Sequence, residues 1–222
     1  MLRRGFLLRL TGAIATLFAG AARAQDATQS ASSSSSTSSA APATFATQSV
    51  SLKTAKGEIT LALEIERAPI TAKNFLKYVD QKRLDGANFY RAMKIKDPHI
   101  TTDIGLIQGG DNSRALPGCK HEPTSVTGLT HSDGVISLAR GKPGTAQGDF
   151  FICLGDMSDF DAGRDGTDDQ LGFAAFGHVT GGMDVVHAIF NAPVSATKGI
   201  GPMKGQMLSP PIRIVTARRI KT

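Results

Sequence analysis

The segment GEITLALEIERAPITAKNFLKYV (57–79) changes its hydrophobic period halfway along, and this change decides how the domain begins. Apolar and polar residues alternate over 59–65, as they do over 50–52 before a Lys-Gly turn, which is the pattern of a β-hairpin. From Pro69 to Val79, larger side chains instead recur every three or four positions, which is the spacing of an amphipathic helix started by proline. We therefore predict a hairpin followed directly by a helix.

Short apolar runs of strand length continue along the chain and bring the candidate strands to eight, the others lying at 88–92, 104–108, 135–139, 150–154, 173–179 and 212–217. A second helix is predicted at 183–190, where apolar residues return to helical spacing after two glycines. The sequence has no internal repeat, and many of its connections contain glycine. These features predict a mainly β fold, a closed eight-stranded antiparallel β-barrel capped by two α-helices.

The first 24 residues have the features of a cleaved export signal. Arginines precede an apolar run at 10–22, and the segment ends in the small-x-small pattern Ala22-Arg23-Ala24. The run is shorter than the roughly 20 residues that span a bilayer, so we expect no stable membrane insertion after cleavage. The start RRGFLL (3–8) resembles a twin-arginine signal, and both that route and the general secretory route stay open.

Residues 25–46 are nearly all Ser, Thr, Ala and Gln, a composition that offers almost no apolar surface to fold around. We predict a disordered tether there, followed by one domain over 47–222. The whole chain has a net charge of +6, but without the four basic residues of the signal 21 basic residues face 19 acidic ones. The resulting charge of +2 is too small for a broad basic face, so we expect no nucleic-acid partner.

Six segments in a fixed order carry a family resemblance: 57–79, GANFYR (86–91), IQGGD (107–111), GVISLARGKPGTAQGDFFI (134–152), GFAAFGHVTGGMDVV (172–186) and the closing strand. In these segments the domain resembles the cyclophilin family of peptidyl-prolyl cis-trans isomerases. The export signal, Arg140 after Ala139, and the GFAAFG segment are most similar to the periplasmic branch of Gram-negative bacteria. The resemblance implies a cyclophilin-like barrel and a periplasmic isomerase that assists the folding of exported proteins, expected to be a monomer.

The implied reaction constrains the site. Rotation of an X-Pro bond breaks amide resonance, at a barrier of about 18–20 kcal/mol, but makes no bond to hydrogen or metal. The site therefore needs no cofactor and no nucleophile, only groups that bind the twisted amide better than the planar one. By the resemblance, Arg91 donates a hydrogen bond to the prolyl nitrogen and Gln108 orients both Arg91 and the peptide carbonyl. From the residues alone, Arg91 would be a solvated strand end and Gln108 a turn residue.

The resemblance also implies an apolar pocket for the proline ring. Phe151 matches the floor of this pocket, and Leu106 lies where the family commonly has methionine. In DFFICL (149–154), strand alternation puts Phe151 on the opposite face from its two neighbours, so one face can fill the barrel while the other lines a groove. Without the resemblance, Phe151 would be assigned to the core.

Four further residues are expected around the groove. Ala139 and Arg140 match family positions that pair with the substrate backbone, and Phe160 and Phe173 are expected to complete the rim. These proline-containing polypeptide substrates are the partners that the resemblance implies.

The sequence departs from the family pattern at several places near the site, and one of them is Phe173, which replaces a histidine at the pocket lip. Gly105 replaces a phenylalanine of the pocket, which removes one wall unless a neighbouring loop supplies it. Asp149 replaces a glutamine. Its carboxylate would either form a bidentate pair with Arg91 or occupy the Arg91 donors that the substrate needs. An insertion at 93–103 lengthens the Arg91 to Gln108 spacing; it would shape substrate choice, restore the wall, or be a tolerated surface loop. Gly105 and Asp149 also favour an alternative function, a proline-binding or chaperone-like module with little catalysis.

Cysteines, acids and histidines give weaker signals. Cys119 and Cys153 would form one disulfide in an oxidising compartment, or Cys153 is simply a buried thiol in an apolar strand. The stretch 156–169 holds six acids in 14 residues but lacks the glutamate that closes an EF-hand, so a mobile acidic loop is expected. The histidines lack metal-ligand spacing, and we expect no metal site.

Overall fold

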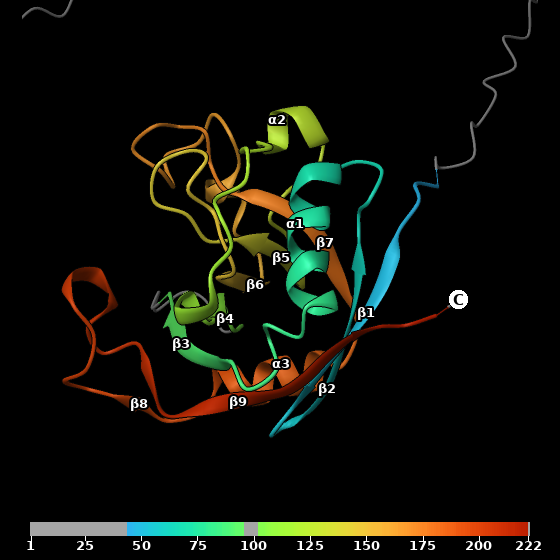
Figure 1. Cartoon of the computed structure of the whole chain (residues 1–222). Coiled ribbons are helices and arrows are strands. Elements are labelled where there is room, and N and C mark those ends of the chain that lie inside the picture. Colours follow the sequence, from blue (N-terminus) through green and yellow to red (C-terminus); the bar gives the residue numbers. More distant parts are fainter. Residues whose placement is uncertain (1–43, 96–101, 222) are drawn as a thin grey trace, which may run out of the picture. The chain divides into compact units, whose positions relative to one another are not determined.

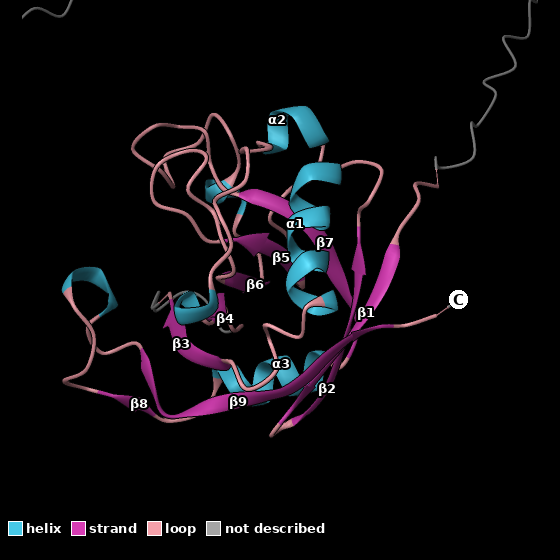
Figure 2. Ribbon diagram, in the orientation of Figure 1, coloured by secondary structure: helices cyan, strands magenta, loops and turns pink. Residues whose placement is uncertain are grey.

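The computed structural model describes residues 44–95 and 102–221, which form nine strands and three α-helices (Figures 1 and 2). The strands are β1 (Gln48–Thr54), β2 (Gly57–Leu63), β3 (Asn88–Lys94), β4 (Gly105–Gly110), β5 (Val135–Leu138), β6 (Phe150–Leu154), β7 (Ala174–Gly181), β8 (Val194–Ser195) and β9 (Met207–Arg219). The helices are α1 (Pro69–Asp80), α2 (Thr124–Thr127) and α3 (Met183–Phe190). The predicted export signal and most of the predicted tether lie outside the described residues.

Eight of the strands close into a barrel. Their order is β1-β2-β7-β5-β6-β4-β3-β9, every pairing is antiparallel, and β9 pairs back with β1. This confirms the predicted eight-stranded antiparallel barrel, and α1 and α3 are the two predicted helices. The two-residue β8 and the four-residue α2 were not predicted, because segments this short show no hydrophobic period.

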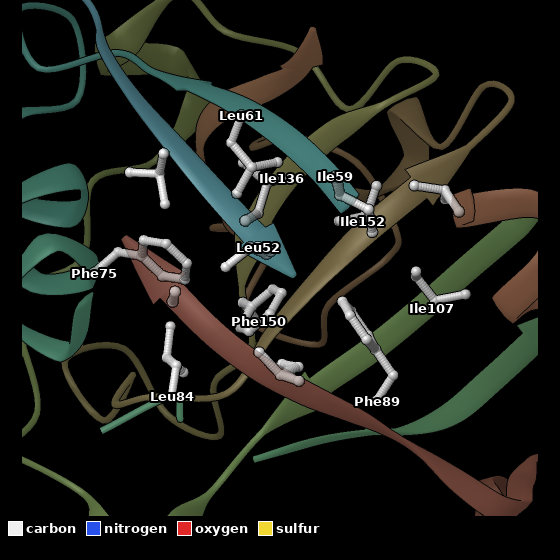
Figure 3. Close-up of a cluster of buried hydrophobic side chains, with 14 of the residues drawn as sticks. Leu52, Ile59, Leu61, Phe75, Leu84, Phe89, Ile107, Ile136, Phe150 and Ile152 are labelled. Carbon is white, nitrogen blue, oxygen red and sulfur yellow. The ribbon is translucent and has the colours of Figure 1, made fainter. Parts of the chain in front are cut away.

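The inner cluster, which we define as the apolar side chains enclosed by the barrel, contains alternate residues of the strands together with the buried faces of α1 and α3. Phe150 lies near its centre, between Phe75 of α1 and Phe89 of β3 (Figure 3). The ring centroids of these two residues lie 5.3 and 5.6 Å from that of Phe150, in edge-on packing. Helix α1 is therefore anchored to the barrel by direct aromatic contact.

The start of α1 is capped from a distant loop. Ala68 at the N-cap has no side-chain acceptor, so the first amides of the helix need one from elsewhere. The buried carboxylate of Glu122 accepts from the backbone N–H of Ile70 at 3.1 Å and of Thr71 at 2.6 Å. Its negative charge also suits the positive end of the helix dipole.

An arm, residues 194–207, connects α3 to β9 and contains β8 and a 3-10 turn at Gly201–Met203. In Figure 1 it projects beyond β3 and returns to start β9. On its return, the carbonyl oxygen of Gln206 accepts from the backbone N–H of Ala92 at 2.9 Å, and Met207 pairs with Arg91. The arm thus ends directly beside Arg91. None of the helices in the described ranges is long and apolar enough to cross a membrane.

Candidate active site

The strand register brings three predicted residues into one row. Arg91 of β3 is the direct partner of Gln108 on β4, and Gln108 is the direct partner of Phe151 on β6. Directly opposite residues of antiparallel strands point to the same face of the sheet. The row therefore lies on the outer face of the barrel, because the residues on either side of Phe151 belong to the inner cluster.

Two amide oxygens hold the guanidinium of Arg91. Its Nη1 donates to Oε1 of Gln108 and its Nε donates to Oε1 of Gln206, both at 2.8 Å. Burial lowers the pKa of Arg91, but a guanidinium starts so high that it keeps its charge at neutral pH. Nη2 makes no hydrogen bond to any group of the described chain segments, so part of this fixed cation still has donors to offer.

A second apolar cluster lies beside this row, and we call it the outer cluster. Its buried members are Leu106, Phe151, Cys153 and Met157, with Met93, Ile104, Ala139, Phe160 and Phe173 packed against them. The rings of Phe151, Phe160 and Phe173 form a triangle with centroid distances of 5.1 to 5.7 Å. The structure therefore brings together the predicted floor and rim residues of the pocket, and it confirms the predicted alternation along β6.

Three polar residues support the floor from behind. The ring of His131 stacks on that of Phe151, with centroids 6.0 Å apart and planes 17° apart. His131 Nδ1 lies 2.6 Å from a carboxylate oxygen of Asp161, and its Nε2 lies 2.9 Å from Oγ of Ser137. Burial lowers the pKa of His131, against the opposing effect of Asp161. Because Ser137 and His131 are fully buried, this arrangement braces the pocket and offers no accessible nucleophile.

The guanidinium of Arg140 braces the rim. It forms a bidentate pair with Asp169 at 2.7 and 2.8 Å and donates to the carbonyl oxygen of Gly172. It also lies over the ring of Phe173, 5.6 Å from the centroid. This pairing holds the pKa of Asp169 well below its usual value. Two acids of the predicted acidic loop, Asp161 and Asp169, are thus tied to pocket residues.

Asp149 is placed differently from the pairing considered from sequence. Its Oδ2 accepts from the hydroxyl of Tyr90 at 2.9 Å and from Nδ2 of Asn112 at 2.8 Å, and the described residues show no contact between Asp149 and Arg91. The bidentate pair is therefore corrected to an indirect link, because Gln108 Nε2 donates to the Tyr90 hydroxyl at 2.8 Å. Burial raises the pKa of Asp149. Burial and the nearby Asp149 raise the pKa of Tyr90, which keeps its proton at neutral pH.

Gly105 follows Ile104 and lies beside Met93, the first residue of the insertion. Gly105 has φ +150°, and a Cβ there would collide with the backbone carbonyl of Met93. Met93 and Ile104 both pack against the outer cluster, whereas a Cβ at Gly105 would also approach the ring of Phe190, which belongs to the inner cluster. Met93 brings the start of the insertion to the outer cluster, and the hypothesis that the insertion restores the wall stays a prediction. Its central residues, 96–101, lie outside the described residues.

Both cysteines are free thiols, so the disulfide considered from sequence is not formed. Cys153 is fully buried in the outer cluster, as the alternative of a small buried thiol predicted, and burial raises its pKa. Within the two described ranges there is no group of three or more His, Cys, Asp or Glu side chains that could hold a metal ion.

Sequence reasoning missed three residues that touch the row or its supports: Tyr90, His131 and Gln206. Tyr90 lies within GANFYR, where its position next to Arg91 was the available signal. Gln206 lies outside every segment that carried the resemblance, and no local pattern marks it. His131 lies six residues before Ser137 in a connection without periodicity.

Comparison with known proteins identifies this arrangement. The family model for cyclophilin type peptidyl-prolyl cis-trans isomerase/CLD matches residues 49–219. The chain belongs to this family. A peptidyl-prolyl cis-trans isomerase of Acinetobacter baylyi is 34% identical over 181 residues, which cover 78% of this chain and 86% of the relative. Peptidyl-prolyl cis-trans isomerase A of Dickeya dadantii is 34% identical over 189 residues, covering 81% and 90%.

Solved cyclophilin structures share the fold. A cyclophilin-type isomerase of Cryptosporidium parvum superimposes with a TM-score of 0.60 at 19% identity, over 80% of this chain and 99% of that chain. A second crystal structure of that protein, obtained in the presence of the dipeptide Ala-Pro, has a TM-score of 0.59. At this identity the likeness supports the cyclophilin fold alone.

Proposed function

We propose that this cyclophilin rotates X-Pro bonds by holding the proline ring on Phe151 while Arg91 stabilises the twisted amide. The observation that carries the proposal is the guanidinium fixed by two amide oxygens beside the aromatic rings of the outer cluster. As the bond twists, the prolyl nitrogen recovers its lone pair and becomes an acceptor. A donor already fixed at that place favours the twisted state over both planar forms.

The required acceleration fits such a device. Uncatalysed X-Pro bonds take tens to hundreds of seconds, so a turnover near a millisecond needs about five decades, or roughly 7 kcal/mol. Removing one preorganised donor from an enzyme site commonly costs about 100- to 1,000-fold in rate. Arg91 would therefore supply a large part of this lowering of the barrier. The proline pocket would supply the rest by holding the ring while the amide turns.

The remaining predicted residues have supporting roles in this proposal. Leu106, Phe160 and Phe173 would enclose the proline ring, and the backbone at Ala139 would align the substrate. Gln108 would hold Arg91 through its oxygen. Arg140 would act on the substrate only through its backbone, because its side chain is committed to Asp169 and Gly172. Asp149 would act through Tyr90 rather than by direct contact.

We also propose that the protein works after export, on proline-containing segments of other exported polypeptides in the periplasm. The export features of 1–24 and the composition of 25–46 support a layout of signal, tether and domain. Phe45, near the end of the predicted tether, already packs under Arg67, 4.8 Å from its guanidinium carbon, so the ordered part would begin near this residue. Mass measurement of the protein recovered from the periplasm should give a chain beginning at Gln25.

The alternative, a proline-binding or chaperone-like module with little catalysis, rested on Gly105 and Asp149. Met93 and Ile104 pack against the outer cluster, and Asp149 binds Tyr90 and Asn112, while Arg91 binds Gln108 and Gln206. Both departures are therefore compatible with an intact site, which favours the enzyme. A monomer with neither nucleic acid nor membrane as partner completes the proposal.

Two-dimensional NMR exchange on an Ala-Pro peptide tests the function, because it measures rotation without a coupled protease. The wild-type protein should accelerate exchange, and Arg91→Ala should lose at least 100-fold while still binding the peptide. Arg114→Ala provides an arginine control away from the row. Peptide binding by the wild type without acceleration would favour the alternative module.

A further inference from the structure

Two sets of hydrogen bonds hold the guanidinium of Arg91, and we call them its two grips. One comes from Gln206 on the arm, and the other comes from Asp149 and Tyr90 through Gln108. We propose that Gln206 on the arm and the Asp149–Tyr90 pair are positioning residues, which together fix the plane of the Arg91 guanidinium. This inference rests on the proposed function, because it concerns the group that acts on the twisted amide. None of the three residues needs to touch the substrate.

Gln206 provides the first grip. Nε of arginine carries a single hydrogen in the guanidinium plane, so its hydrogen bond fixes a direction as well as a distance. Gln206 Oε1 accepts it at 2.8 Å, while Gln108 Oε1 accepts from Nη1 at the same distance. With acceptors on two different nitrogens, the planar group cannot rotate about its own axis without breaking one bond. Nη2 and its two hydrogens have no hydrogen-bond partner among the described residues.

The arm itself is anchored where this grip is made. The backbone carbonyl of Gln206 accepts from the N–H of Ala92, the residue that follows Arg91. The side chain and the backbone of one residue therefore hold two consecutive positions of β3. A displacement of the arm would move the acceptor of Arg91 together with the end of the strand.

Asp149 and Tyr90 provide the second grip, through the amide of Gln108. Tyr90 donates its single hydroxyl hydrogen to Oδ2 of Asp149, at 2.9 Å. The Tyr90 oxygen must then accept from Gln108, whose Nε2 lies 2.8 Å away. With its nitrogen turned to Tyr90, the Gln108 amide presents its oxygen to Arg91. If the Gln108 amide were turned by half a rotation, its NH2 group would face the N–H donors of Arg91, and no hydrogen bond could form between them.

Substitutions that remove one grip at a time test the proposal. Gln206→Met keeps the length of the side chain but removes the acceptor, and Tyr90→Phe removes only the hydroxyl. We expect each to lower kcat about tenfold with less than a twofold change in KM, because positioning matters most in the twisted state. Gln206→Glu keeps an acceptor for Nε and should stay within about threefold of wild type. Ile200→Ser, on the exposed tip of the same arm, should leave the rate unchanged.

The double variant is the sharper measurement. Because both grips act through one guanidinium, Gln206→Met combined with Tyr90→Phe should lose far less than the roughly 100-fold product of the single effects. The proposal also predicts a spectroscopic change. The Nε–H signal of Arg91, assigned by its loss in Arg91→Ala, should exchange faster with water in Gln206→Met but not in Ile200→Ser.

Any of the following results would overturn the proposal: a Gln206→Met protein with the wild-type rate, fully multiplicative losses in the double variant, or an unchanged Nε–H exchange rate. Melting temperatures are measured alongside, and a rate loss that merely follows lower stability, and that Gln206→Glu does not rescue, also counts against it. Failure of the proposed function looks different, because Arg91→Ala itself would then retain the wild-type rate.

Discussion

The inner and outer clusters are built on the two faces of the same strand, β6, yet they are closed in different ways. Phe150 faces inward, where strands and α1 surround it, and Phe151 faces outward, where loop residues Phe160 and Phe173 cover it. The inner cluster is thus closed by backbone pairing and the outer one by side chains from connections. One strand can therefore serve stability and recognition separately, because its period of two keeps the faces apart.

The neighbouring phenylalanines give the largest expected contrast. Phe150→Ala should lower the free energy of unfolding by about 3–5 kcal/mol, because the sealed barrel cannot collapse around the cavity. Phe151→Ala should cost less than half of that, because the loop rings can close in, but it should lower kcat/KM at least tenfold. Urea unfolding and the peptide exchange assay measure the two effects. Equal stability losses would break the comparison between the clusters.

Gly105 tests whether the close approach of the Met93 backbone requires a residue without a side chain at this position. At Gly105 the positive φ and the close Met93 carbonyl both oppose a side chain, so Gly105→Ala should lose about 2–3 kcal/mol of stability. Gly141→Ala is the matched control, since its Cβ would meet only Oγ1 of Thr145, at 3.5 Å. Its stability should change by less than about 0.5 kcal/mol. Two variants of equal stability would show that Met93 moves aside.

The insertion gives a smaller, purely functional effect. Met93→Ala should raise KM about threefold with little change in kcat, because it removes part of the wall without touching Arg91, and should cost less than about 1 kcal/mol. Ile95→Ala is the control on the same segment, since its side chain is exposed. An unchanged KM in Met93→Ala would favour the alternative that the insertion is a tolerated surface loop.

The support behind Phe151 should give the smallest effect, visible in the pH dependence of stability. Because burial lowers the pKa of His131, the unfolded chain binds a proton that the folded chain excludes. This contribution is complete above the unfolded pKa of about 6.5 and is lost as pH falls below it, by at most about 1.4 kcal/mol per pH unit. His131→Asn should flatten the curve between pH 7.5 and 5.

Burial raises the pKa of Asp149, so this group makes stability fall as the pH rises, opposite to the effect of His131. Asp149 is present in both the wild type and His131→Asn. The difference between the two curves therefore isolates His131. Parallel curves would mean that the ring of His131 contributes packing alone.

Local patterns were sufficient for the barrel, and the alternation around Phe150 and Phe151 assigns each ring to its face of β6. Arg91 and Gln108 were assigned through the family resemblance, because the residues alone indicated only a solvated strand end and a turn. The supports could not be predicted, because they join residues far apart in sequence. Gln206 reaches Arg91 across 115 positions, and Glu122 reaches α1 across 51. Asp149 was considered as a partner of Arg91 but binds Tyr90, because a sequence pattern assigns a residue to a face of the sheet and not to a partner.

The buried thiol of Cys153 makes the outer cluster observable in solution. It lies in the outer cluster with no accessible surface, whereas Cys119 is partly accessible and packs against the inner cluster. An alkylating reagent should therefore modify Cys119 first and reach Cys153 only when the aromatic cover opens. The ratio of the two alkylation rates thus measures how often the outer cluster opens in solution, and the measurement needs no added label.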